Sequence, residues 1–179
     1  MPGDAFPSGR LAGVHVAPVF LDRERTLAKI ESLTAEAAQH GARIVAFGEA
    51  FVPGFPLWCL VQRPIDQHQQ FQQLYANAVL VPGPETSRLA QIARRNDVYL
   101  SVGLTERSPV SLGGLFNTNL IFAPSGELLA HHRKLVPTWA ERLVWAPATE
   151  PASGPWTRTS VDWGCSSAVR TPIPSPGTP

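Results

Sequence analysis

The 179-residue sequence has little cysteine, no long apolar run and almost no net charge. Its two cysteines lack metal-ligand spacing, which implies neither a disulfide framework nor a zinc site. No segment approaches the roughly eighteen apolar residues of a membrane span, and the N-terminus does not resemble a signal peptide. A net charge of +1 without a basic stripe argues against nucleic acid and anionic membrane as partners. We therefore expect a cytoplasmic protein.

What the sequence does contain is the alternation of helix and strand patterns that is typical of an α/β domain, with 44% hydrophobic residues. A first strand is predicted over residues 13–20, interrupted at Pro18. Asp22 is placed to cap a helix that runs to about His40, before a stop at Gly41. Further helices are predicted over 66–78 and 86–95, and a further strand over 98–104.

Glu49 follows a short apolar segment that includes Ile44, Val45 and Phe47. The segment favours a strand, and Pro53, Gly54 and Pro56 prevent regular structure from continuing beyond it. Glu49 is therefore predicted at a sheet edge, where α/β enzymes keep their chemistry. The alternative is a solvated carboxylate in a strand-end loop.

Lys134 is predicted at the end of a second strand. Residues 119–123 are apolar apart from Asn119, Pro124 to Gly126 form a turn, and the apolar run resumes at residues 128–130. This pattern predicts a β-hairpin. A lysine in this position is more often a surface cation than a catalytic group.

The Glu49 segment, the Arg133-Lys134-Leu-Val-Pro-Thr-Trp-Ala-Glu141-Arg142 motif and the distance between them resemble the nitrilase branch of the carbon–nitrogen hydrolase superfamily. The resemblance runs from about Gly13 to Trp145, so residues 1–146 are assigned as the N-terminal part of such a domain. It implies an α-β-β-α sandwich, here incomplete, and homo-oligomeric assembly. It also implies a catalytic Glu-Lys-Cys set with a supporting glutamate, carried by Glu49, Lys134 and Glu141.

These residue types suit attack on a nitrile or amide carbon, a poor electrophile that calls for a thiolate nucleophile. Glu49 would take the thiol proton and deliver it to the substrate nitrogen. Lys134 would stabilise the charge that develops on the substrate heteroatom. Glu141 would orient Lys134, although an ordinary loop carboxylate paired with Arg142 is an equal alternative. The chemistry requires no metal and no organic cofactor.

The nucleophile is missing from its expected place. In the family it lies some thirty residues beyond the lysine, in an apolar-apolar-Cys-(Gly/Trp)-Glu-Asn pattern. Cys59 is at the wrong position and is predicted to be an apolar packing residue or a thiol beside the pocket rather than the nucleophile. Cys165 is at a suitable distance but lacks the apolar strand before it and the Gly-Glu-Asn after it, so it is only a weak candidate.

Residues 147–179 are compositionally foreign to the rest of the chain, because they hold seven of its eighteen prolines and show no periodicity. Read in a displaced frame, their codons permit Gly-Leu-Leu-Ile-Cys-Gly-Glu-Asn, with the cysteine codon straddling Ser167 and Ala168. We therefore interpret the segment as an out-of-frame translation. The alternative is a genuine proline-rich flexible tail.

Two further residues lie close to these motifs. Glu106 can line the site in this superfamily, but its position alone predicts a surface carboxylate at a strand end. His132 is interpreted as a packed or solvated residue, with an influence on Lys134 as the alternative.

The function indicated is hydrolysis of a nitrile to a carboxylic acid and ammonia, with this chain inactive because it lacks the nucleophile. The loop Phe51–Trp58 resembles nitrilases more than amidases or carbamoylases, which are the alternatives within the superfamily. A different alternative is a non-catalytic remnant that binds small nitriles or amides, or associates with full-length subunits.

Overall fold

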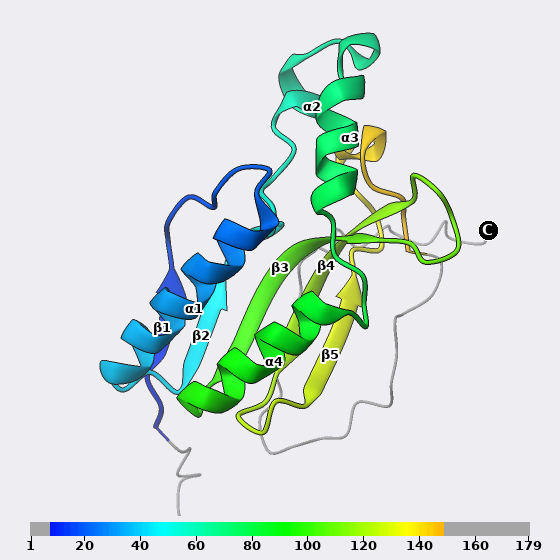
Figure 1. Ribbon diagram of the computed structural model, residues 1–179. Coiled ribbons are helices and arrows are strands. Elements are labelled where there is room, and N and C mark those ends of the chain that lie inside the picture. The colour runs from blue at the N-terminus through cyan, green and yellow to red at the C-terminus, as the bar shows by residue number, and fades with distance from the viewer. Residues whose placement is uncertain (1–7, 149–179) are drawn as a thin grey trace, which may run out of the picture.

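Five strands form one mixed sheet in residues 8–148, the part of the chain that the computed structural model describes (Figure 1). They are β1 (Leu11–Val14), β2 (Ile44–Phe47), β3 (Tyr99–Arg107), β4 (Leu115–Phe122) and β5 (Leu128–Arg133), and they lie in sequence order. β1, β2 and β3 are parallel, whereas β4 is antiparallel to both β3 and β5. The C-terminal ends of β2 and β5 therefore lie at the same edge of the sheet.

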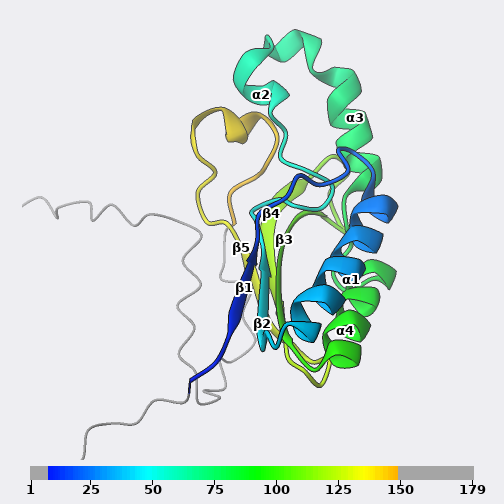
Figure 2. The same ribbon diagram turned by 90° about the vertical axis from the view of Figure 1, so that its left-hand side faces the viewer.

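Two helices, α1 (Arg23–Gln39) and α4 (Pro84–Asn96), cover one face of this sheet (Figure 2). α1 begins as predicted, because the Asp22 carboxylate accepts a hydrogen bond of 2.9 Å from the Arg25 backbone N–H. It ends before Gly41, whose φ of +81° belongs to the left-handed region that glycine adopts easily. The sequence prediction of both helices is confirmed.

The main core lies between these helices and the sheet. Alternate strand residues point toward the helices and are buried, as the two-residue period of a strand requires. The buried residues of this core include Leu27, Ile30, Val45, Phe47, Leu89, Ile92, Leu100, Val102, Leu104, Leu120 and Phe122. The intervening residues, such as Tyr99 and Ile121, are only half-buried. Residues 8–148 thus supply one helix layer and one sheet, which is half of the expected sandwich.

The segment between β2 and α4 extends beyond the end of the sheet (Figure 1). It contains α2 (Trp58–Val61), the 3-10 helix η1 (Pro64–Asp66) and α3 (His68–Asn77). A second apolar cluster forms where this segment meets the loop after β5, which holds the 3-10 helix η2 (Trp139–Leu143). Its buried members are Ala50, Trp58, Cys59, Leu74, Ala78, Leu115, Val144 and Trp145.

The first strand differs from its predicted bounds. β1 spans Leu11–Val14, and residues 15–20 have no regular structure. Pro18 has no backbone N–H, so it cannot donate a hydrogen bond to a sheet.

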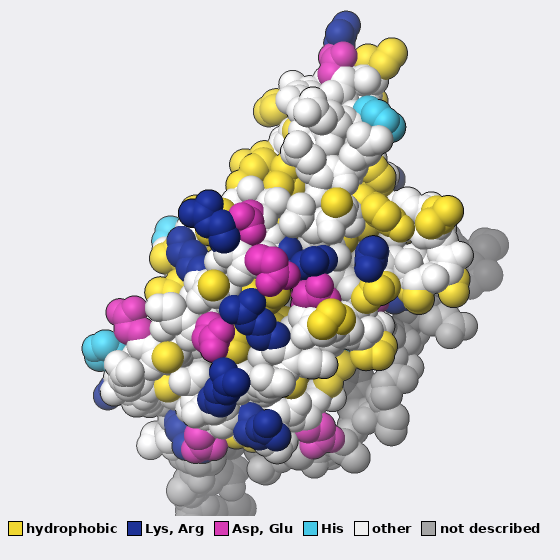
Figure 3. All heavy atoms as spheres, viewed as in Figure 1, with side chains coloured by type: hydrophobic (Ala, Val, Ile, Leu, Met, Phe, Trp, Pro, Cys, Tyr) yellow, Lys and Arg dark blue, Asp and Glu magenta, His cyan; other side chains and the backbone are white. Residues whose placement is uncertain are grey.

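The helix-covered side of the molecule carries acidic and basic side chains interspersed over α1 and α4 (Figure 3). Arg88 and Arg95 of α4 both pair with Glu31 of α1, at 3.1 Å each. None of the helices in residues 8–148 is long and apolar enough to cross a membrane.

Candidate active site

Glu49 lies directly beyond β2, in a backbone segment that packs closely on β3. Ala50 has a φ of +48°, and the chain then rejoins the sheet through a 3.2 Å hydrogen bond from the Val52 N–H to the Gly103 carbonyl. Gly103 allows this approach, because a Cβ on it would lie 2.8 Å from the Glu49 Cα. The predicted position of Glu49 at the sheet edge is confirmed.

Lys134 follows β5 directly and reaches the same edge. Its backbone N–H donates to the Asn117 carbonyl at 2.7 Å, which continues the pairing with β4. Its side chain is 8% exposed, and the ammonium lies 2.9 Å from Glu49 Oε1 and 2.8 Å from Glu141 Oε2. The expectation of a surface cation, based on the lysine alone, is therefore wrong.

Glu141 is held by its own turn as well as by Lys134. Thr138-Trp-Ala-Glu141 forms a capping box at the start of η2, in which the Thr138 backbone N–H donates to Glu141 Oε2 at 2.8 Å. Arg142 instead donates to the Pro137 carbonyl at 3.1 Å. Of the two alternatives considered for Glu141, the contact with Lys134 is the one present.

The charge of Lys134 is fixed by these carboxylates. Burial by itself lowers the pKa of the ammonium, but the hydrogen bonds to Glu141 and Glu49, together with their negative charges, outweigh it and raise the pKa above its ordinary value. Lys134 is therefore a permanent cation at neutral pH, clamped between two carboxylates.

Asn117 is a member of the cluster that sequence reasoning missed. Its side-chain Nδ2 donates to Glu49 Oε1 at 2.6 Å, the same oxygen that binds Lys134. Within residues 8–148 no donor binds Glu49 Oε2, and the Glu49 side chain is 43% exposed. One carboxylate oxygen is thus held in place while the other is open to an incoming group. Asn117 lies in β4 but outside the segment predicted as a strand from the sequence, residues 119–123, so no local signal pointed to it.

Glu106 does not lie on the surface, and that part of its prediction is wrong. It is the penultimate residue of β3 and has no exposed surface. Two side chains of β5, two strands away, bind its carboxylate: the Arg133 guanidinium at 2.5 Å and the His131 ring at 2.8 Å. Its contacts are with His131 and Arg133 rather than with Glu49, Lys134 or Glu141. His132, the neighbour considered in the sequence, is half-buried.

Cys59 is buried in the second apolar cluster, as expected of a packing residue. Burial, and then the negative charge of Glu141, raise the pKa of its thiol, which disfavours the thiolate form. Cys165 lies outside the described residues, as does the segment from residue 149 onward. Within residues 8–148, no group of three or more His, Cys, Asp or Glu side chains is placed to hold a metal ion.

The sequence model of the carbon–nitrogen hydrolase family matches residues 10–167. A nitrilase from Bacillus sp. (strain OxB-1) is 39% identical over 140 residues, covering 78% of this chain and 40% of that protein. The bifunctional nitrilase/nitrile hydratase NIT4A of Nicotiana tabacum is 39% identical over 144 residues with the same coverage. This chain thus spans about 40% of the length of these curated relatives.

Solved structures agree on the fold. An amidase from Nesterenkonia sp. has a TM-score of 0.57 at 22% identity, covering 84% of this chain and 53% of that one. A double mutant of the same amidase, in complex with acrylamide, has a TM-score of 0.58 at 23% identity, covering 82% of this chain and 52% of that one. The fold is therefore an incomplete α-β-β-α sandwich. From the sequence match, the chain belongs to the carbon–nitrogen hydrolase family.

Proposed function

We propose that this chain is the N-terminal part of a nitrilase-type hydrolase, which converts an organic nitrile and two waters to a carboxylic acid and ammonia. The observation that carries the proposal is the Lys134 ammonium, held 2.9 Å from Glu49 Oε1 and 2.8 Å from Glu141 Oε2. The names of the curated relatives, which include nitrilases, support the nitrile as substrate.

In the proposed reaction, Glu49 accepts the proton of a cysteine thiol through its open oxygen, Oε2. The thiolate adds to the nitrile carbon, and Glu49 returns the proton to the nitrogen, which gives a thioimidate. Addition of water and loss of ammonia yield a thioester, and a second water releases the acid and the thiol. Lys134 stabilises negative charge on the substrate heteroatom, and Glu141 keeps its ammonium oriented.

The nucleophile is the part of the proposal that lies outside the described residues. We propose that residues from about 147 are translated out of frame and that the family cysteine is encoded at the codons for Ser167 and Ala168. The composition of the segment supports this, whereas the family match, which continues to residue 167, supports the given frame. The nucleotide sequence across the codons for Trp145 to Ala148 decides: an intact frame, with no insertion or deletion relative to active relatives, disproves the frame change.

Ammonia release from a panel of nitriles tests the function. We expect the given chain to be silent and a frame-restored chain to be active. Lys134→Met in the active chain should reduce kcat by about 100-fold or more, because a preorganised charge is lost at the reacting centre. Glu49→Gln should abolish turnover while substrate still binds. If the given chain hydrolyses nitriles and Cys165→Ala stops it, Cys165 is the nucleophile and the frame account is wrong.

An amide is the second candidate substrate. The solved structures of similar fold are amidases, one in complex with acrylamide and one with butyramide, but their identity to this chain is 23% at most. Including amides in the same panel separates the two activities. A frame-restored chain that binds these compounds without releasing ammonia would instead be the non-catalytic remnant.

A further inference from the structure

A second cluster of charged residues lies beside the candidate active site without touching its carboxylates or ammonium. At its centre is the buried Glu106 on β3. Its Oε2 accepts hydrogen bonds from Thr118 Oγ1 at 2.7 Å, His131 Nε2 at 2.8 Å and Arg133 Nε at 3.1 Å, while Oε1 accepts one from the second nitrogen of the Arg133 guanidinium at 2.5 Å. Both carboxylate oxygens therefore accept hydrogen bonds, and the Arg133 guanidinium binds the carboxylate in a bidentate manner.

This cluster and the active-site cluster lie on opposite faces of the same sheet. Thr118 pairs with Arg133 in the strand register, and Leu120, which faces the helices, pairs with His131. Arg133 and His131 therefore point to the helix-covered face. The next residue, Lys134, points to the other face, where its ammonium binds Glu141 of η2. The segment that holds η2 lies on the side of the sheet opposite α1 and α4 (Figure 2). Arg133 and Lys134, which are adjacent at the end of β5, thus bind carboxylates on opposite faces of the sheet.

The end of β5 is fixed tightly on the helix-covered face. Besides its bonds to Glu106, the Arg133 guanidinium lies 4.2 Å from the centre of the Phe116 ring. β3, β4 and β5 are thereby tied together at the last residue before Lys134. His131 of β5 binds the same Glu106 carboxylate, so two side chains of β5 hold one side chain of β3.

We propose that Glu106 is a positioning residue of the active site, which fixes Arg133 so that the adjacent Lys134 ammonium is held between Glu49 and Glu141. The inference rests on the proposed function, because only then does the position of Lys134 matter for catalysis. The effect of Glu106 on the position of Lys134 can nevertheless be measured without enzyme turnover. The competing explanation is that Glu106 only stabilises the fold.

The chain offers a simple readout, because Lys29 and Lys134 are its two lysines. Brief acetylation of the full chain under native conditions, followed by peptide mass spectrometry, gives the ratio of the labelling rates of Lys134 and Lys29. In the unaltered chain Lys134 should label slowly, because it is buried and ion-paired. In Glu106→Gln the neutral amide no longer holds Arg133, and we expect the Lys134/Lys29 ratio to rise about tenfold, as for loss of a buried charged partner.

A matched control separates positioning from stability. Glu85 is also a largely buried carboxylate, 3.1 Å from Arg23, but its ionic partner lies on α1 rather than on β5. Glu85→Gln should lower the stability while leaving the Lys134/Lys29 ratio within about twofold of the unaltered chain, since global unfolding exposes both lysines. Equal ratios in Glu106→Gln and Glu85→Gln would overturn the proposal.

If circular dichroism shows that Glu106→Gln does not fold, Thr118→Val and His131→Gln carry the test. Each removes one donor to Glu106 and should raise the ratio by a smaller factor in the same direction; an unchanged ratio in both overturns the inference. Because no step requires turnover, absence of nitrile hydrolysis in the frame-restored chain would count against the proposed function and not against the role of Glu106.

Discussion

Glu106 is a charged carboxylate without solvent contact. The shift of its pKa measures how much its hydrogen-bonding partners contribute to the stability of the fold. Burial alone raises this pKa, but the hydrogen bonds from His131 and Arg133, the charge of His131 and the bond from Thr118 lower it from 4.5 to about 2. A lowered folded-state pKa means that the charged form stabilises the fold. The stabilisation is therefore complete above pH 4.5 and is lost as the pH falls toward 2, for a total of about 3 kcal/mol.

Glu106→Gln should accordingly lower the free energy of unfolding at pH 7, and the difference from the unaltered chain should shrink between pH 4.5 and pH 2. Urea unfolding followed by circular dichroism at a series of pH values measures this difference. Glu31→Gln, which removes an exposed carboxylate from the α1–α4 surface pairs, serves as the control and should change stability by less than about 1 kcal/mol. If the loss of unfolding free energy in Glu106→Gln does not depend on pH, the Glu106 carboxylate is not charged in the folded chain.

Some residues of the site could be predicted from the sequence, and others could not. Glu49, Lys134 and Glu141 could be predicted to come together because each belongs to a local motif and the motifs match a family. Asn117 and Glu106 could not be placed, since their partners lie on segments that are distant in the sequence. Whether a carboxylate at position 106 is exposed depends on Arg133 and His131, which reach it only once β3, β4 and β5 have paired.

At the scale of elements, Gly103 decides how closely the segment after β2 packs on β3. A Cβ on Gly103 would lie 2.7 Å from the Ala50 nitrogen and 2.8 Å from the Glu49 Cα, and these are backbone atoms that cannot rotate away. Gly103→Ala should therefore displace Glu49 from Lys134 and destabilise the chain by about 1–3 kcal/mol. Urea unfolding measures the loss, and the acetylation rate of Lys134 reports the broken contact.

Gly13→Ala is the matched control for this change, because Gly13 also lies in a strand but its Cβ would meet nothing within 4 Å. We expect it to leave both stability and Lys134 labelling nearly unchanged. If Gly103→Ala behaves in the same way, Glu49 is not held by close packing on β3.

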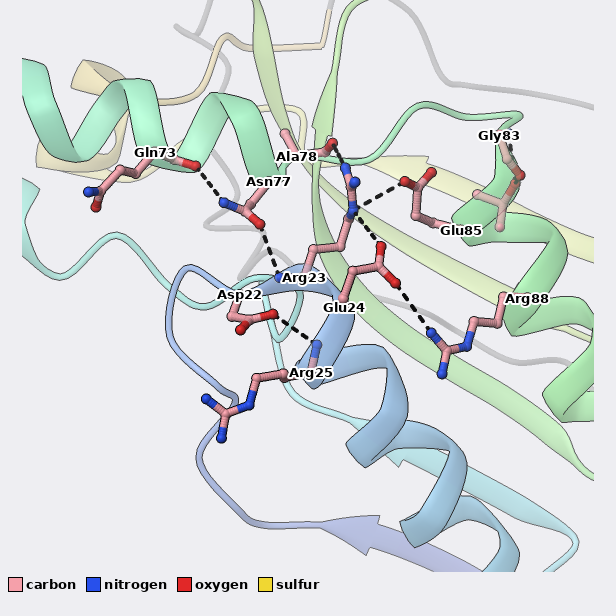
Figure 4. Close-up of polar contacts among 11 residues, drawn as sticks. Asp22, Arg23, Glu24, Arg25, Gln73, Asn77, Ala78, Gly83, Glu85 and Arg88 are labelled. Carbon is pink, nitrogen blue, oxygen red and sulfur yellow. Dashed lines mark hydrogen bonds and ion pairs between the residues drawn. The ribbon is translucent and has the colours of Figure 1, made fainter.

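The junction of α1, α3 and α4 depends on one arginine at the start of α1 (Figure 4). The Arg23 guanidinium donates to the Ala78 carbonyl at 3.2 Å and pairs with Glu85 at 3.1 Å, while the Arg23 backbone N–H donates to Asn77 Oδ1 at 3.2 Å. The side chain thus joins the end of α3 to the first turn of α4.

Arg23→Ala should lower the free energy of unfolding by about 1–3 kcal/mol, because it leaves the largely buried Glu85 without its partner. Arg25→Ala is the comparison, since Figure 4 shows the Arg25 side chain directed away from this junction, and it should cost less than about 0.5 kcal/mol. Thermal unfolding of the two variants side by side gives the difference. Equal losses would mean that the junction is not held by Arg23.

Elements with local signals were predictable, and those defined by distant contacts were not. α1 has its Asp22 cap and Gly41 stop, and the β4–β5 hairpin has its Pro-Ser-Gly turn. α2 and η1 have no such signals, because they are short and lie among prolines. The position of α2 depends on packing against η2 and Trp145, and η1 contacts α3. β1 was misplaced because its apolar residues continue beyond the point where pairing with β2 ends.

At the scale of the whole molecule, the sheet is covered by helices on one face, and the chain spans about 40% of its curated relatives. A two-layer arrangement places the main core between the helices and the sheet. Leu120 belongs to this core, whereas its neighbour Ile121 points to the opposite face and is half-buried. Two adjacent aliphatic residues of β4 therefore report separately on the two faces.

Leu120→Ala should lower the free energy of unfolding by about 3 kcal/mol, and Ile121→Ala by about 1 kcal/mol, because only the first change leaves a cavity in a packed core. Urea unfolding of both variants measures the contrast. In a frame-restored chain we expect the cost of Ile121→Ala to approach that of Leu120→Ala, since a second sheet would then cover the opposite face. Equal costs already in the given chain would mean that this face is packed against another layer as tightly as the helix-covered face.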